Sequence, residues 1–201
     1  PETTLDQVVR ARYSELGDFV NQPYSYSLTR EGDAIALTLR RDGHLWQGAC
    51  FCPLRVEKVV RLRAGSPDVE ARYTLTNTCG QSIAAQFAVE TSWALLGGNG
   101  PTASGVVPGR LPFGFNEPAD LPHSPELALR LGWLAMEIVL SFSAAPALWL
   151  FPLHTISNSE AGYERIYQGT CVWVRWPLAL APGESWSVTL RCTPRTVPAA
   201  A

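Results

Sequence analysis

Apolar and polar residues alternate with a period of two along most of this chain, as in strands that bury one face of a sheet. The clearest case is residues 69–76, which we predict to form a half-buried antiparallel strand. A second strand is predicted over residues 83–95, with large apolar side chains on one face. Its other face carries small and polar residues, among them Glu90, so a ligand or another backbone could approach there.

The same alternation predicts further strands over residues 35–40, 56–63, 127–134, 137–143, 147–153, 163–176 and 185–192. Asp42–Gly43 is a hairpin turn signal, after which residues 45–52 return as a strand. Residues 97–125 hold six glycines and six prolines and are predicted to form a long loop. Apolar residues at helical spacing predict one helix over residues 4–16, with Thr3 and Asp6 as its capping pair and Gly17 as its end.

These elements predict an all-β protein, a large antiparallel β-sandwich with one short N-terminal helix. Roughly ten strands with no alternation of strand and helix exclude a parallel α/β architecture. We expect residues 1–195 to form a single domain and residues 196–201 to be a disordered tail. The first residue is Pro1, so we expect the 201 residues to belong to a longer polypeptide.

Composition narrows the choice of partners and compartment. A formal net charge of −2 gives no electrostatic basis for binding nucleic acid or an anionic membrane. The five cysteines are odd in number and scattered, which is not typical of a disulfide framework. We therefore expect free thiols in a reducing cytoplasm. No spacing of metal-ligand side chains is visible, so no metal or cofactor is predicted.

Residues 149–169 combine one Trp, two Tyr, one His, two carboxylates and a Gln. Aromatic rings stack on the apolar faces of sugars, while carboxylates and amides form hydrogen bonds with hydroxyl groups. The simpler interpretation of residue types alone is a strand–loop–strand corner with a satisfied polar network. The sequence contains no nucleophile elbow, phosphate-binding loop, zinc-protease motif or dinucleotide fingerprint, so no residue is assigned a catalytic role.

Three motifs resemble those of a known family. They are Arg12–Phe19, then residues 73–77 with Phe87 and Glu90, and then residues 155–164 with the Tyr167-Gln168-Gly169 run. The chain resembles the C-terminal β-sandwich domain of family 57 glycoside hydrolases, the α-amylases and 4-α-glucanotransferases. It departs from the family pattern at Gly17-Asp18-Phe19, which lacks a histidine, and at Glu90-Thr91-Ser92, where an asparagine is expected.

The resemblance implies a galactose-mutarotase-like supersandwich that also includes strands preceding residue 1. It implies a non-catalytic accessory domain that packs on a catalytic barrel of the parent enzyme and contacts α-1,4-glucan. The candidate carbohydrate-binding residues are Glu90, Trp149, His154, Glu160, Tyr163, Glu164 and Gln168.

Two alternatives remain open. One is a stand-alone aldose epimerase that pairs His154 with Glu90 or Glu164 as acid and base. The other is a purely structural interaction domain whose apolar patch is covered by the rest of the parent chain.

Overall fold

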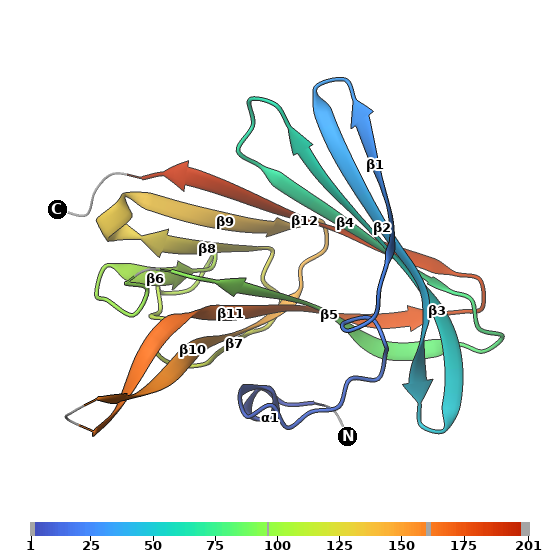
Figure 1. Ribbon diagram of the computed structural model, residues 1–201, viewed down its shortest axis with the longest axis horizontal. Helices are drawn as coiled ribbons and strands as arrows, with labels where there is room; N and C mark the ends of the chain where they lie inside the picture. The colour runs from blue at the N-terminus through green and yellow to red at the C-terminus, as the bar shows by residue number, and fades with distance from the viewer. Residues whose placement is uncertain (1–2, 96, 160–161, 198–201) are drawn as a thin grey trace.

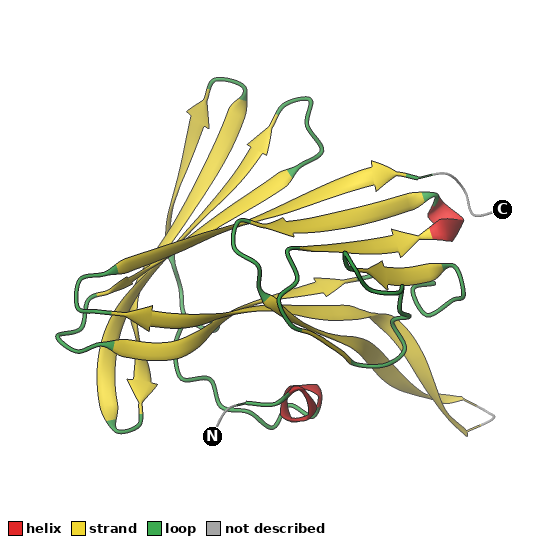
Figure 2. Ribbon diagram, turned by 180° about the vertical axis from the view of Figure 1, so that it is seen from behind, coloured by secondary structure: helices red, strands yellow, loops and turns green. Residues whose placement is uncertain are grey.

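The computed structural model describes residues 3–95, 97–159 and 162–197, and nearly all of this chain is β-structure in two sheets (Figures 1 and 2). Within these residues every pairing between named strands is antiparallel. Sheet A has eight strands in the order β1 (Ser25–Glu31), β2 (Ala34–Gln47), β3 (Cys50–Arg63), β4 (Val69–Asn77), β12 (Ser185–Thr196), β9 (Met136–Phe142), β8 (Glu126–Leu131) and β6 (Ala103–Val106). Sheet B has four strands in the order β5 (Ile83–Trp93), β11 (Gly162–Leu180), β10 (Ala147–Ser159) and β7 (Ala119–Leu121). The predicted all-β antiparallel sandwich is confirmed.

The core lies between the two sheets. Strands β4 and β12 supply Leu75 and Val188, and the facing strands β10 and β11 supply Leu148 and Val174; each of the four is at most 1% exposed. Asn77, fully buried at the end of β4, joins the two layers because its amide nitrogen donates to the carbonyl oxygen of Leu180 on β11 at 3.0 Å.

The helix is much shorter than the predicted helix over residues 4–16. Helix α1 spans only Leu5–Val9, and its capping box pairs Thr4 with Gln7 rather than Thr3 with Asp6. Ala11 adopts a left-handed conformation with φ of 51°, which stops the helix well before Gly17. In both ribbon views, α1 lies beneath sheet B, on the side away from sheet A (Figures 1 and 2).

The predicted turn at Asp42–Gly43 is wrong, because both residues lie inside the long strand β2. The chain turns instead at Gly48, whose φ of 63° suits a tight connection between β2 and β3. Gly43 has a different reason to be glycine. A Cβ there would lie 2.5 Å from Asp18 Oδ1 and 2.8 Å from Phe19 Cε1, so the segment around residue 18 packs directly on the strand.

Other boundaries also differ from the predictions. Strand β1 was not predicted, and the loop predicted over residues 97–125 contains β6 and β7. Strand β12 continues to Thr196, and the Val197 N–H donates to the Ala135 carbonyl oxygen at 2.9 Å, so the first two residues of the expected tail are ordered. Residues 198–201 lie outside the described part. Among the described residues, no helix has the length and apolar character needed to cross a membrane.

Candidate functional site

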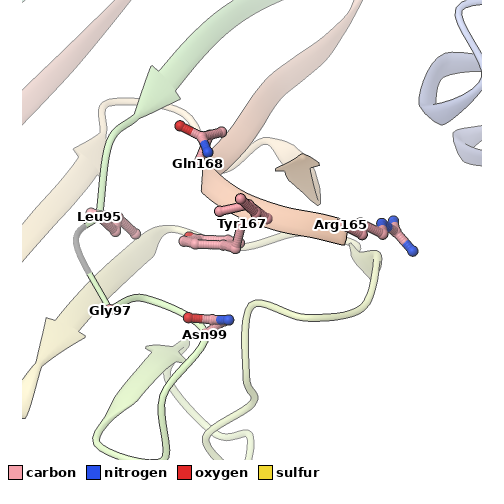
Figure 3. Close-up of a pocket in the computed structure, with 7 residues that line it drawn as sticks. Leu95, Gly97, Asn99, Arg165, Tyr167 and Gln168 are labelled. Atoms are coloured by element: carbon pink, nitrogen blue, oxygen red, sulfur yellow. The ribbon is translucent and has the colours of Figure 1, made fainter. Parts of the chain in front are cut away.

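A pocket of about 330 Å³ opens beside the long β10–β11 hairpin (Figure 3). One wall is the segment after β5, and the other is the part of β11 next to the hairpin. Figure 3 shows Tyr167 at the centre, with Gln168 and Asn99 on opposite sides of it. The lining residues are Leu95, Gly97, Asn99, Arg165, Ile166, Tyr167 and Gln168.

A β-bulge positions Gln168 at this pocket. The pairing of β10 with β11 runs regularly to Leu153 and Gly169 and then resumes with His154 and Tyr167, which leaves Gln168 as the extra residue. The Gln168 side-chain amide donates to Thr155 Oγ1 at 3.0 Å, which fixes its orientation. A bulge of this kind bends the strand and changes the direction of its side chains, so it determines the direction in which the hairpin extends.

Tyr167 is the half-buried aromatic residue of the pocket. Its hydroxyl forms a hydrogen bond with Thr170 Oγ1 at 2.7 Å. Burial raises the pKa of Tyr167 above its ordinary value, although the hydrogen bond with Thr170 opposes that effect. Tyr167 therefore presents a neutral phenol, and Gly98 allows the close approach because a Cβ there would lie 2.7 Å from the hydroxyl oxygen.

His154 lies on β10 across from Tyr167, and their ring centroids are 6.1 Å apart. Its Nδ1 is 3.1 Å from Nη2 of Arg165. A guanidinium can only donate hydrogen bonds, so Nδ1 must be the acceptor and the imidazole must be neutral. Burial and then the charge of Arg165 lower the pKa of His154, which agrees with a neutral imidazole.

Two further predicted residues belong to the described part of the hairpin but do not line the pocket. Tyr163 is 84% exposed, and Glu164 is exposed beside it. Because neighbouring strand residues face opposite ways, these two cannot point to the same side of the hairpin. Glu160 lies outside the described residues.

The other two predicted residues lie on the outer face of sheet B, which we define by Glu90, Trp149, Trp173 and Arg175. Glu90 accepts a hydrogen bond from Trp173 Nε1 at 2.8 Å, and the Tyr13 ring meets Trp173 edge-on at 5.0 Å. Trp149 is only 4% exposed, because Arg175 Cζ lies 3.3 Å from its ring centroid and Trp173 stacks beside it at 6.3 Å. A stacking role for Trp149 does not fit this burial.

The structure therefore divides the predicted residues that it describes between two places, the hairpin and the outer face of sheet B. Among these described candidates, Gln168 alone lines the pocket. Sequence reasoning missed Asn99, Arg165 and Tyr167 as pocket residues, although Tyr167 stands in a motif that it quoted. It also missed Trp173 beside Glu90. Strand parity gives Trp173 the same face as Trp149 once the register of the β10–β11 hairpin is known.

Three of the five cysteines, Cys50, Cys52 and Cys79, form a cluster. Cys50 Sγ and Cys52 Sγ are 3.6 Å apart, as expected for alternate residues on one face of a strand. Burial and the neighbouring thiols of Cys50 and Cys79 raise the pKa of Cys52 to about 11, so it stays protonated. Among the described residues, no group of three or more metal-ligand side chains could hold a metal ion.

Comparison with protein families gives a match over residues 1–190 to the model described as "Alpha-amylase/4-alpha-glucanotransferase, C-terminal". The chain is 32% identical over 179 residues to a 4-alpha-glucanotransferase of Thermococcus kodakarensis, a match that covers 89% of this chain and 22% of that protein. The chain thus spans about a fifth of the length of this curated relative.

Comparison with solved structures agrees with the sequence comparisons. The crystal structure of 4-alpha-glucanotransferase from Thermococcus litoralis matches with a TM-score of 0.72 and 26% identity over 96% of this chain and 26% of that one. A putative aldose 1-epimerase from Escherichia coli K12 matches with a TM-score of 0.62 and 13% identity over 86% of this chain and 69% of that one. At that identity the second likeness concerns the fold alone, which is galactose-mutarotase-like.

Proposed function

Because the chain belongs to the family of C-terminal domains of α-amylases and 4-α-glucanotransferases, we propose that it is a non-catalytic accessory domain of a larger enzyme acting on α-1,4-glucan. We place the chemistry of glycosidic cleavage or transfer elsewhere in that parent chain. In this proposal the domain packs against the catalytic barrel and contributes a contact to the glucan. Its unpaired cysteines support a reducing cytoplasm as the expected compartment.

The pocket beside the β10–β11 hairpin carries the proposal of glucan contact. Tyr167 offers an aromatic surface, while Asn99, Arg165 and Gln168 offer amide and guanidinium groups around it. Such a mixture suits a pyranose, which has apolar ring faces and hydroxyl groups at its rim. Tyr163 lies further along the hairpin on the same face as Arg165 and Tyr167, where a longer glucan would meet it, whereas Glu164 faces the other side.

Glu90 is a secondary candidate on the outer face of sheet B. Its hydrogen bond from Trp173 orients the carboxylate beside an aromatic ring, an arrangement that also suits a sugar. The same bond equally suits a structural role that ties β5 to β11. We therefore use Glu90 as the comparison site in the test below.

The epimerase alternative is not favoured. The sequence relatives are glucanotransferases and amylases, and the likeness to aldose epimerases is one of fold. His154 accepts a hydrogen bond from Arg165 on the hairpin, whereas Glu90 is bonded to Trp173 on the outer face of sheet B. Glu164 pairs with Ser157, three residues from His154 on β10, and therefore lies on the opposite face of the hairpin. Neither candidate carboxylate thus shares a site with His154.

Titration of the chain with maltoheptaose, followed by amide chemical shifts, tests the glucan contact. We expect saturable shifts at residues 95–99 and 165–168, with a dissociation constant of about 1 mM because few groups make the contact. Gln168→Ala should weaken binding several-fold, and Glu90→Gln should leave it unchanged. Absence of shifts at about 10 mM sugar, in a chain with a dispersed spectrum, would show that this pocket is no glucan contact.

A further inference from the structure

Sheet A buries one face only over part of its width. One row of side chains can be followed from strand to strand across β1, β2, β3, β4 and β12, because each residue pairs with the next on the neighbouring strand. The row consists of Leu28, Leu37, Val60, Ala71 and Leu190, whose side chains therefore lie on the same face. The exposed fraction falls along this row from 66% at Leu28 to 9% at Ala71 and 7% at Leu190. Sheet B therefore covers this face from β4 onward. On β2 and β3 the same face is buried only at the far ends, where Leu45, Cys52, Leu54 and Val56 are at most 5% exposed. The part of β1–β3 next to the β1–β2 turn is left without cover.

This uncovered face is apolar and continuous. Tyr26 is 77% exposed, and Ile35 and Leu62 are 48% and 50% exposed. In Figure 1 the β1–β2 and β3–β4 hairpins rise away from sheet B, which explains the exposure. We define the uncovered face by Tyr26, Leu28, Ile35, Leu37, Leu39, Val60 and Leu62.

The opposite face of the same strands is already a polar, solvent-facing surface. Arg61 pairs with Glu31 at 3.1 Å, Arg63 pairs with Asp33 at 2.7 Å, and further pairs continue across to β12. The alternation in β1–β3 thus assigns one face to water and the other to burial. The uncovered face has the pattern of a buried one, but no second layer formed by the described residues covers it.

The edge of sheet A adds a second requirement. Within the described residues, β1 pairs with β2 alone, and all seven of its residues are exposed. The strand contains no proline and no bulge, and its charged residues, Arg30 and Glu31, stand only at the end next to the turn, so residues 25–29 carry none of the usual means of protecting an edge. A long, regular edge strand beside an apolar face can pair with a further strand.

The remainder of the parent polypeptide is the occupant that fits best. The chain spans 22% of its Thermococcus kodakarensis relative, so most of that protein lies outside this segment. The E. coli structure with this fold contains more chain than these residues match, since they cover 69% of it. The rows of this face hold two charged residues, Lys58, whose Nζ lies 5.5 Å from the Tyr73 ring, and Arg30, which pairs with Ile35 next to the β1–β2 turn. So sparse a charge is typical of a permanent interface rather than a transient one.

We infer that the uncovered face and the β1 edge form the docking surface for the rest of the parent chain. This inference rests on the proposed function in that it takes the domain to be part of a larger enzyme. It goes further by naming the strands and side chains that make the contact. It is independent of the glucan pocket, which lies beside the β10–β11 hairpin.

Cysteine labelling of the parent polypeptide tests the inference. Leu28→Cys places a thiol on the uncovered face, and Ser27→Cys places one on the polar face of the same strand. In the native parent, maleimide should modify Cys at position 28 at least about tenfold more slowly than at position 27, because labelling there needs local opening. Peptide mass spectrometry reads both sites, and equal rates in denaturant provide the control. Equal rates in the native protein would overturn the inference.

A photo-crosslinker identifies the occupant. Benzoylphenylalanine at position 28, in a mixture of isotopically light and heavy parent chains, should link to a peptide outside the 201 residues of the same chain. Links between light and heavy chains would instead assign the face to a second copy and overturn the inference. Glucan titration of the same proteins reads the pocket separately, so loss of sugar binding with protection intact would contradict only the proposed glucan contact.

Discussion

The two halves of sheet A have the same alternation of apolar and polar residues but different environments. In the half formed by β4, β12, β9 and β8, the inward residues are buried by sheet B, and Leu75, Leu127 and Leu140 are at most 1% exposed. In the half formed by β1–β3, the rows next to the β1–β2 turn are open, and Leu28 is 66% exposed, whereas the far ends of β2 and β3 are buried. Alternation thus indicates which face of a strand is suited to burial. How much that face contributes to the free energy of unfolding depends on whether another layer covers it.

The largest expected effect comes from truncating matched leucines in the two halves. Leu75→Ala should lower the free energy of unfolding of the chain by about 3 kcal/mol, because it leaves a cavity between the sheets. Leu28→Ala should change it by less than about 0.5 kcal/mol, because the side chain has little burial to lose. Urea denaturation of both variants measures the difference. Equal losses would mean that the β1–β3 face is covered even in this chain.

A smaller effect is expected from the polar tie between the layers in the covered half. Asn77→Ala removes an amide that bonds to the Gln81 and Leu180 carbonyl oxygens at 2.8 and 3.0 Å, so both acceptors lose a partner. We expect a loss of about 2 kcal/mol in denaturant unfolding. Thr76→Ala, one residue earlier on the exposed face, is the matched control, and an equal loss there would refute the special role of Asn77.

In the open half, Asp18 should make stability depend on acid. Burial alone would raise the pKa of Asp18, but hydrogen bonds from the His44 N–H and from Arg41 outweigh it and lower the pKa below its ordinary value. The stabilisation is therefore present above the unfolded-state pKa and is lost as pH falls through the lower folded-state value. Asp18→Asn should cost about 1 kcal/mol at pH 7 and flatten the decline below pH about 4. Unfolding curves measured from pH 7 to 3 test this, and parallel declines in both proteins would contradict it.

The smallest effect is expected for the ion pairs on the polar face of the open half. Arg63→Ala breaks the 2.7 Å pair with Asp33, in which both side chains are more than half exposed. Stability should change by less than about 0.5 kcal/mol, since solvent screens such pairs. Thermal unfolding in low and high salt checks it, and a salt-dependent loss above about 1 kcal/mol would show that charge holds this half together.

Sequence patterns predicted best where a strand is covered on one side by residues of this chain. Strand β4 was predicted within a residue of its end, and the exposed alternation around Glu90 on β5 is confirmed. The turn at Asp42–Gly43 was misassigned because Gly43 serves contact with Asp18 and Phe19, which are distant in sequence. Strand β1 was missed although Tyr26 and Leu28 alternate with Ser and Thr, because the run is short and has few apolar residues.

The candidate site was harder to predict for a related reason. Its composition was visible in residues 149–169, but the pocket also needs Asn99, which lies in a segment about which local patterns say nothing. The bulge at Gln168 depends on the register between two strands and cannot be derived from either one alone. The burial of Trp149 likewise comes from Arg175 on the adjacent strand.

That bulge makes the hairpin adjustable in evolution. Leu153 pairs with Gly169 and His154 with Tyr167, so Gln168 is a single residue added to a ladder that is regular on either side. Losing it would leave each of the flanking side chains on its present face while straightening the ribbon. Insertion or deletion of one codon could therefore change the direction of the β10–β11 hairpin in related enzymes, with the rest of both strands unchanged.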